Sequence, residues 1–162
     1  MKKIVMLLLG TTVILSCNKT STDPVTCPYT ESTLVAPAAE IAVVQAYVNT
    51  NAPTAVQHSS GIFYEVTSAG TGTVTPGLCS YLTVKYTGKL FNNTIFDQNL
   101  FGTTFQLGNL IIGWQKGIPQ IKKGGTIRLF VPPSLGYGAS GSGTSVPPNA
   151  YLIFEIQLID VQ

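Results

Sequence analysis

The most constraining feature of this chain is a regular alternation of apolar and polar residues over positions 151–161. Leu152, Phe154, Ile156 and Leu158 occupy every second position, and a glutamate and a glutamine stand between them. Successive side chains of a strand point to opposite faces, so this segment predicts a strand with one apolar face. Such a strand is typical of an antiparallel sheet that is covered on one side only.

Three further segments, residues 62–67, 81–90 and 126–131, have the composition and pattern of strands. A glycine-rich turn at 70–77 separates the first two of them. Asn92-Asn93 follows the second, and asparagine tolerates the left-handed conformation that a tight turn requires. Sixteen glycines and ten prolines also favour a β-rich fold with many turns over a helical bundle.

Residues 113–121 interrupt the strands with a helical pattern, because Trp114, Ile118 and Ile121 would share one face. Pro119 keeps this helix short, since proline removes a backbone donor and clashes with the preceding turn. A short helix packed against a half-buried antiparallel sheet gives an α+β domain.

Residues 36–52 predict an earlier helix of about three turns, with Pro37 near its start and Asn49 and Asn51 at its end. A lone helix of this length is marginal in water. We therefore expect this N-terminal helical extension, residues 36–59, either to pack on the domain or to form a weak interface element.

Residues 1–16 predict a secretory signal peptide. Lys2 and Lys3 form a basic start, and the apolar run at 4–15 is shorter than the about 20 residues that a membrane-spanning helix needs. A buried core helix is the alternative, but the run shows no amphipathic period.

The end of the signal, Ile14-Leu15-Ser16-Cys17, resembles the lipobox of bacterial lipoproteins, although Leu15 is bulkier than the small residue usual there. The resemblance implies cleavage before Cys17 and acylation of this cysteine. Several acyl chains, at about 0.8 kcal/mol per buried CH₂, hold a soluble domain on a membrane. Residues 17–35, which are polar and unperiodic, would be the lipidated tether, and the protein would be anchored in the cell envelope, at the outer membrane facing the periplasm.

The formal charge of +2 includes Lys2 and Lys3 of the signal peptide, and without them cations and anions balance at seven each. A neutral domain has no electrostatic footprint for a phosphate backbone, and Lys122-Lys123 is too short a run to create one. Nucleic acid is therefore not an expected partner.

Three cysteines are present, and two remain if Cys17 carries lipid. An even number of thiols in an oxidising compartment favours a disulfide, here between Cys27 and Cys79. In the chain-entropy model such a link contributes about 4 kcal/mol. The alternative is two unrelated thiols, with Cys79 packed as a small hydrophobic side chain.

A series of short motifs occurs in a fixed order in the second half of the chain. They are Val84-x-Tyr86-Thr87-Gly88-x-Leu90, Phe96-Asp97, Phe105-x-Leu107-Gly108, Leu110-Ile111-x-Gly113-Trp114-x-x-Gly117, Leu129-x-Val131-Pro132, Gly136-Tyr137-Gly138, Val146-Pro147-Pro148-Asn149 and Leu152-x-Phe154. In this order they resemble the FKBP-type peptidyl-prolyl cis/trans isomerases, and in architecture the chain is similar to the FKBP-type lipoproteins of Gram-negative bacteria such as the Bacteroidetes. The resemblance implies a twisted antiparallel half-barrel sheet wrapped on one short helix, formed by residues 60–162.

The resemblance also implies a pocket for proline-containing polypeptides, floored by the tryptophan. A backbone N–H at Ile111 and a hydroxyl at Tyr137 would donate hydrogen bonds to ligand carbonyls. Macrolides such as rapamycin or tacrolimus are further implied ligands, and no cofactor or metal is implied. Catalytic roles fall to Tyr86, Phe96, Asp97, Tyr137 and Phe154, and substrate-binding roles to Leu110, Ile111, Trp114 and Val146.

Rotation about an X–Pro bond requires no nucleophile, because the barrier of about 18–20 kcal/mol comes from amide resonance that an apolar pocket weakens. The sequence lacks the residue patterns that hydrolases and metalloenzymes require. His58 is the single histidine and lies outside the motifs, and no Ser-His-Asp set, paired carboxylates or Cys/His ligand spacing is present. The expected function is a prolyl isomerase that assists the folding of exported proteins at the cell envelope.

Two competing functions are open. The groove could bind unfolded clients without turnover, because Thr103 and Ser142 stand where many relatives carry an aromatic residue and a histidine, which thins one rim. Alternatively, the chain could be a structural lipoprotein that docks through its helix at 37–49. Taken by residue type alone, Tyr86, Trp114 and Phe154 would simply be core aromatics.

Overall fold

The structure is a computed structural model that describes residues 26–162. The predicted signal peptide and Cys17 lie outside the described residues. Among the described residues, no helix has the length and apolar character required to cross a membrane.

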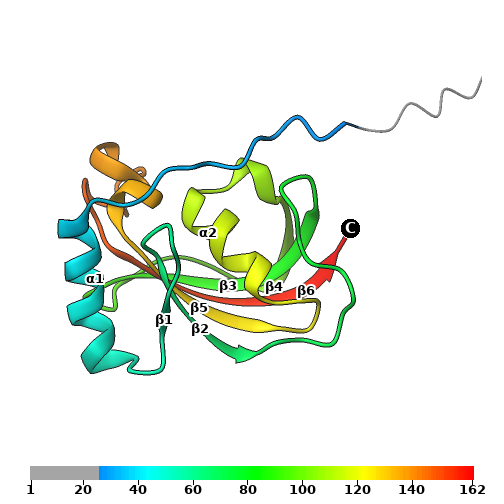
Figure 1. The fold of residues 1–162 in the computed structure, drawn as a ribbon, viewed down its shortest axis with the longest axis horizontal. Helices are drawn as coiled ribbons and strands as arrows, with labels where there is room; N and C mark the ends of the chain where they lie inside the picture. The colour runs from blue at the N-terminus through cyan, green and yellow to red at the C-terminus, as the bar shows by residue number, and fades with distance from the viewer. Residues whose placement is uncertain (1–25) are drawn as a thin grey trace, which may run out of the picture.

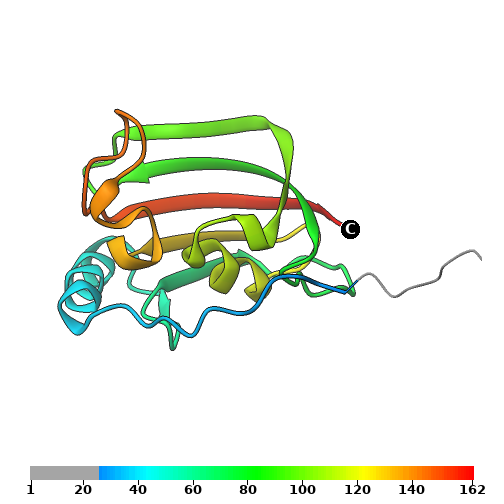
Figure 2. The same cartoon turned by 90° about the horizontal axis from the view of Figure 1, so that it is seen from above.

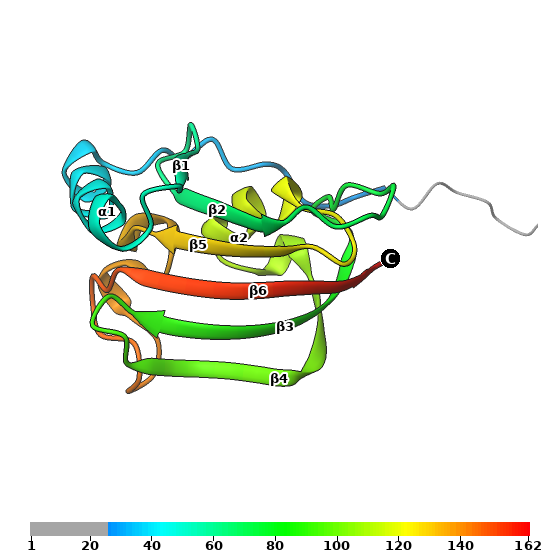
Figure 3. The same cartoon turned by 90° about the horizontal axis from the view of Figure 1, so that it is seen from below.

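Six antiparallel strands form one sheet in the order β1-β2-β5-β6-β3-β4 (Figure 3). The strands are β1 (Val56–Gln57), β2 (Phe63–Ser68), β3 (Tyr81–Leu90), β4 (Ile95–Gln106), β5 (Thr126–Val131) and β6 (Leu152–Val161). The helices are α1 (Ala38–Asn51) and α2 (Ile112–Gly117), with 3₁₀ turns η1 (Leu107–Asn109), η2 (Ile118–Gln120), η3 (Pro133–Leu135) and η4 (Gly138–Ser140). The α+β prediction is confirmed.

The sheet curves around α2, and the main core fills the space between them (Figures 1 and 2). The alternation in β6 builds this face, since Leu152, Phe154, Ile156 and Leu158 are all buried against the helix side. The helix side contributes Trp114, Ile118 and Ile121, which are buried as their shared face predicted.

The helix α2 can approach the sheet closely because it carries glycine where it meets β5. A Cβ atom at Gly117 would lie 2.4 Å from Leu129 Cδ2, so any larger residue there would push the helix outward. The helix ends at Gly117 and continues as the turn η2, in which Pro119 stands at an early position.

The predicted N-terminal helix is confirmed as α1, and it packs on the second face of the sheet at one end (Figure 3). A separate cluster joins Val44 and Val48 of α1 to Phe63, Phe130 and Ile153 of three strands. The prediction that only one face is covered is therefore wrong at this end, because Phe63, Phe130 and Ile153 give the outer face an apolar patch that the helix buries.

A carboxylate also ties α1 to the loop after β5. Glu40 accepts hydrogen bonds from the backbone N–H and the hydroxyl of Ser134, at 3.0 and 2.8 Å. The extension is thus integrated into the domain, and the apolar face of α1 is used inside the molecule rather than left free for docking.

Two strands were absent from the sequence-based prediction. The strand β1 is only two residues long, and β4 is a long edge strand whose pairing with β3 shifts register between Val84 and Tyr86. The turn that precedes β4 is confirmed, since Asn93 has a positive φ of 67°.

A disulfide joins Cys27 to Cys79 with Cα atoms 5.6 Å apart. It attaches the segment before α1 to the loop before β3, so residues 27–37 run along the domain past η1 and α2 (Figure 1).

Candidate active site

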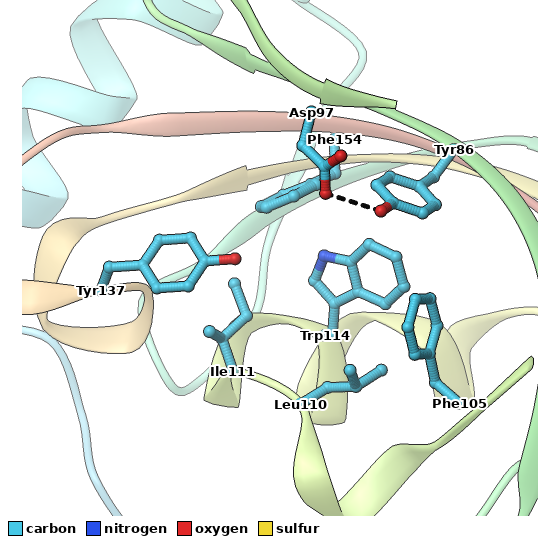
Figure 4. A pocket seen from close by; sticks show the side chains of 8 residues that line it. All are labelled: Tyr86, Asp97, Phe105, Leu110, Ile111, Trp114, Tyr137 and Phe154. Carbon is cyan, nitrogen blue, oxygen red and sulfur yellow. Dashed lines mark hydrogen bonds between the residues drawn. The ribbon is translucent and has the colours of Figure 1, made fainter. Parts of the chain in front are cut away.

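A cavity of about 190 Å³, lined mainly by aromatic side chains, opens between α2 and the concave face of the sheet (Figure 4). Its volume lies below the about 300–1,000 Å³ of typical small-molecule pockets, so it can enclose a single amino-acid ring but only part of a larger ligand. The cavity is lined by Tyr86, Asp97, Phe105, Leu110, Ile111, Trp114, Tyr137 and Phe154.

The sole tryptophan of the chain forms the floor of the cavity. Trp114 is only 4% exposed, and three aromatic rings stand nearly perpendicular to it. The ring centroids of Tyr86, Phe154 and Phe105 lie 5.4, 5.3 and 6.3 Å from that of Trp114. Edge-to-face packing of this kind fixes the ring orientations, so the cavity is held in shape without a ligand.

A short hydrogen bond joins two of the residues that line the cavity. The Tyr86 hydroxyl donates to Asp97 Oδ2 at 2.6 Å, and the two residues come from paired strands β3 and β4 (Figure 4). Burial and the adjacent carboxylate raise the pKa of Tyr86 well above its ordinary value. The phenol therefore remains a proton donor to Asp97 at all physiological pH values.

Tyr137, which follows η3, points its hydroxyl toward the cavity from the opposite side (Figure 4). Burial raises the pKa of Tyr137, and the charge of Asp97 adds to the effect. No hydrogen bond from this hydroxyl forms within residues 26–162, and the Ile111 N–H at the start of α2 makes none there either. Both donors are thus available to a ligand.

The indole N–H of Trp114 is a third polar group in this region. It is buried and has no hydrogen-bond partner among the described residues. An unsatisfied donor of this kind is uncommon in a folded core. Its position on a cavity-lining ring places the unmet donor beside the cavity.

Most of the predicted site residues meet in this one cavity, and two do not line it. Phe96 and Val146 both line an adjacent depression that Asp97 and Tyr137 also border. The Phe96 ring packs edge-on against Phe154 with ring centroids 5.6 Å apart, and Val146 is buried. Phe105 lines the cavity although it was absent from the predicted set, and its place in the Phe105-x-Leu107-Gly108 motif was the signal for it.

The single histidine lies apart from the cavity. His58 is half-buried beside Ser60, with Nδ1 2.9 Å from the serine hydroxyl oxygen, and burial together with Lys116 lowers its pKa. Within residues 26–162 no group of three or more His, Cys, Asp or Glu side chains could hold a metal ion. The cavity therefore offers aromatic rings, one carboxylate and three donors without a partner among the described residues, namely the Tyr137 hydroxyl, the Ile111 N–H and the indole N–H of Trp114.

Residues 70–159 match the model of the family described as FKBP-type peptidyl-prolyl cis-trans isomerase. The chain belongs to this family. A probable FKBP-type isomerase of Haemophilus influenzae is 42% identical over 105 residues, which cover 63% of this chain and 43% of that protein. FkpA of Escherichia coli is 38% identical over 107 residues, which cover 64% of this chain and 39% of that protein. The chain thus matches less than half the length of these two FKBP-type relatives.

Two solved structures share the FKBP-type fold with this chain. The crystal structure of FkpA from Escherichia coli superposes with a TM-score of 0.69 at 35% identity, over 77% of this chain and 60% of that one. A peptidyl-prolyl cis-trans isomerase from Pseudomonas syringae superposes with a TM-score of 0.67 at 32% identity, over 78% of this chain and 97% of that one.

Proposed function

We propose that this protein catalyses cis/trans isomerisation of X–Pro bonds in the Trp114 cavity. The observation that carries the proposal is the cavity itself, in which five aromatic residues line a ring-sized space beside three hydrogen-bond donors that have no partner among the described residues. Membership of the FKBP-type family supports the same reaction.

The reaction follows from removing water around the proline imide. Partial double-bond character of the C–N bond creates a barrier of about 18–20 kcal/mol, and the charge-separated resonance form behind it is stabilised by water. An aromatic cavity withdraws that stabilisation from the planar ground state more than from the twisted, less polar transition state. A ten-thousandfold acceleration requires only about 5.4 kcal/mol.

The free donors orient the substrate in this scheme. The Tyr137 hydroxyl and the Ile111 N–H would bind substrate carbonyls on either side of the proline, while the ring sits above Trp114. Asp97, held by Tyr86, shapes the field at the carbonyl before proline. Because these groups are fixed before binding, little reorganisation is required at the transition state.

An isomerisation assay on a Leu-Pro or Phe-Pro peptide tests the proposal. The purified protein should accelerate isomerisation over buffer, and Tyr137→Phe should reduce kcat/KM about tenfold, the equivalent of one net hydrogen bond. Asp97→Val should also reduce it. If the wild-type protein gives no acceleration over buffer, the enzyme proposal is wrong.

A second candidate function, client binding without turnover, is favoured by one observation. Phe101 is 97% exposed and its neighbour Leu100 is 57% exposed, both on the edge strand β4. Exposed apolar residues of this kind are a feature of surfaces that bind unfolded chains. Suppression of client aggregation that survives both Asp97→Val and saturation with rapamycin would support this function over catalysis.

Rapamycin and tacrolimus are proposed ligands of the same cavity. Because Trp114 is the only tryptophan, its emission should change when a macrolide occupies the cavity. Trp114→Leu should abolish both the signal and macrolide protection against urea unfolding. Unchanged emission and stability at saturating rapamycin would exclude macrolide binding.

The protein is proposed to act at the cell envelope, anchored through lipid on Cys17, with only the residues between Cys17 and the disulfide-bonded Cys27 left to serve as the tether. The lipobox-like sequence supports this, as does similarity to a Legionella longbeachae protein named outer membrane protein MIP, 38% identical over 117 residues. Metabolic labelling with palmitate should mark the wild-type protein and not Cys17→Ala. Label retained by Cys17→Ala would contradict the anchor.

A further inference from the structure

Tyr29, near the N-terminal end of the described chain, contacts a loop that carries two walls of the cavity. The segment that contains it is held to the domain by the Cys27–Cys79 disulfide, two residues away. A weaker contact follows along the same segment, where Lys116 Nζ of α2 lies 3.8 Å from Glu31 Oε2.

The contact of Tyr29 with the loop is close and specific. Its ring covers Gly108 so tightly that a Cβ atom at that glycine would lie 2.4 Å from Tyr29 Cγ. Its hydroxyl oxygen lies 2.7 Å from Asn109 Oδ1 and 2.9 Å from Gln106 Oε1. Because the hydroxyl has a single hydrogen, it donates to one of these two amide oxygens at a time. Gln106 and Asn109 lie on either side of Gly108 in the sequence.

The same loop is hydrogen-bonded to the residues around Cys79 of the disulfide. The Gly108 N–H donates to Leu78 O at 2.7 Å, and Gln106 Nε2 donates to Cys79 O at 3.4 Å. The disulfide, the tyrosine and the loop therefore form one connected unit rather than three separate contacts.

The loop is linked to the cavity wall through hydrogen bonds from Gln115 and through the residues that follow it in the chain. Gln115 of α2 donates from Nε2 to Gly108 O at 3.2 Å and to Leu110 O at 2.7 Å. Leu110 and Ile111 follow directly, and both line the cavity. The loop is thus held between Gln115 on one side and Tyr29 on the other.

We propose that Tyr29, held in place by the Cys27–Cys79 disulfide, is a positioning residue for the wall formed by Leu110 and Ile111. The inference rests on the proposed isomerase function. Without the tyrosine the loop keeps its hydrogen bonds to Gln115 and to Leu78 but loses the ring that covers Gly108. The Ile111 N–H then no longer stands at a fixed distance from the substrate. Displacement of about 1 Å in a positioned group can reduce rate up to a hundredfold, so a partial loss of support should be measurable.

The test compares four variants, and one combination of two of them, with the wild type in the Leu-Pro assay, at a temperature where urea titration shows each to be folded. Tyr29→Ala removes the support, and Cys27→Ser/Cys79→Ser releases the segment. Tyr29→Phe retains the ring over Gly108. Val35→Ala, on the same segment and 55% exposed, is the matched control.

Tyr29→Ala and the double serine variant should each lower kcat/KM about three- to tenfold, with Tyr29→Phe and Val35→Ala within twofold of wild type. Combining Tyr29→Ala with the serine pair should add little, since both remove the same support. Emission of Trp114 and its quenching by acrylamide should shift in the two defective variants and be rescued in Tyr29→Phe.

Wild-type values of kcat/KM and of Trp114 quenching in Tyr29→Ala would overturn the inference while leaving the isomerase function intact. If the wild type itself proves inactive, the isomerase proposal fails separately. In that case acrylamide quenching of Trp114 alone decides whether Tyr29 positions the wall, and equal quenching in wild type and Tyr29→Ala rejects it.

Discussion

At the scale of single residues, the pair Tyr86 and Asp97 defines the polar side of the cavity. The hydrogen bond between them is short because a neutral phenol donates to a charged carboxylate. Neither residue would be singled out by its type alone, since both occur often on surfaces and in turns. The collinear motif made them predictable, whereas Phe105 was predictable only as a motif member and not as a wall.

Removing this hydrogen bond should weaken catalysis in a non-additive way. Tyr86→Phe and Asp97→Asn should each lower kcat/KM about tenfold, because a bond to a charged group contributes about 1.5–3 kcal/mol, part of it to orientation. The double variant should be little worse than either single variant. Additive losses in a double-mutant cycle would show that the two residues act independently.

The raised pKa values of Tyr86 and Tyr137 predict a stability loss at alkaline pH. Both groups stay neutral in the folded protein at a pH where tyrosine in the unfolded chain, with its ordinary pKa of 10.0, ionises. Their contribution is complete below pH 10 and is lost as pH rises above it. Urea unfolding between pH 8 and pH 11 should show this decline, and Tyr86→Phe/Tyr137→Phe should decline less. Equal slopes would contradict the pKa assignments.

At the scale of elements, the strands that alternate cleanly were predictable and the edge strand β4 was not. β6 lies between two neighbours and buries Leu152, Phe154, Ile156 and Leu158 on one face, so its alternation is visible in the sequence even though Ile153 is buried on the other face. β4 pairs only with β3 and contains a register shift, at which Asn99 Oδ1 accepts the backbone N–H of Phe101 and Gly102. The additional residues of β4 at this register shift break the alternation of apolar and polar side chains from which a strand is predicted.

The helix α1 offers a direct test of the second covered face. Val48 is 2% exposed against the sheet, and Val43 on the same helix is 45% exposed. Val48→Asp should destabilise the domain by about 3 kcal/mol or more, since an unpaired charge would be buried. Val43→Asp, the control, should change the free energy of unfolding by about 0.5 kcal/mol or less. Equal effects in urea titration would mean that α1 does not cover the sheet.

At the scale of the whole molecule, the disulfide converts the N-terminal segment from a free tether into part of the domain. Counting cysteines left two arrangements open, because pairing depends on a distance that sequence does not provide. The cavity likewise depends on three-dimensional placement: Val146 belongs to the motif set, yet it faces a neighbouring depression instead.

Removing the disulfide should lower the stability of the whole domain. It spans a sequence separation of 52 residues, for which the chain-entropy model gives about 4 kcal/mol. Cys27→Ser/Cys79→Ser should therefore unfold at lower urea concentration with a similar slope. An unchanged midpoint, with the thiols of the wild type confirmed as oxidised by mass spectrometry, would show that the link constrains only the segment.

The central claim is that the aromatic cavity over Trp114 accelerates rotation about a prolyl bond. Exchange spectroscopy by NMR measures this directly, on a Leu-Pro peptide in which cis and trans signals are resolved. With substoichiometric protein, the exchange rate should rise in proportion to protein concentration while the cis/trans ratio stays constant, and Trp114→Leu should remove most of the rise. An exchange rate equal to that of peptide alone would contradict the claim.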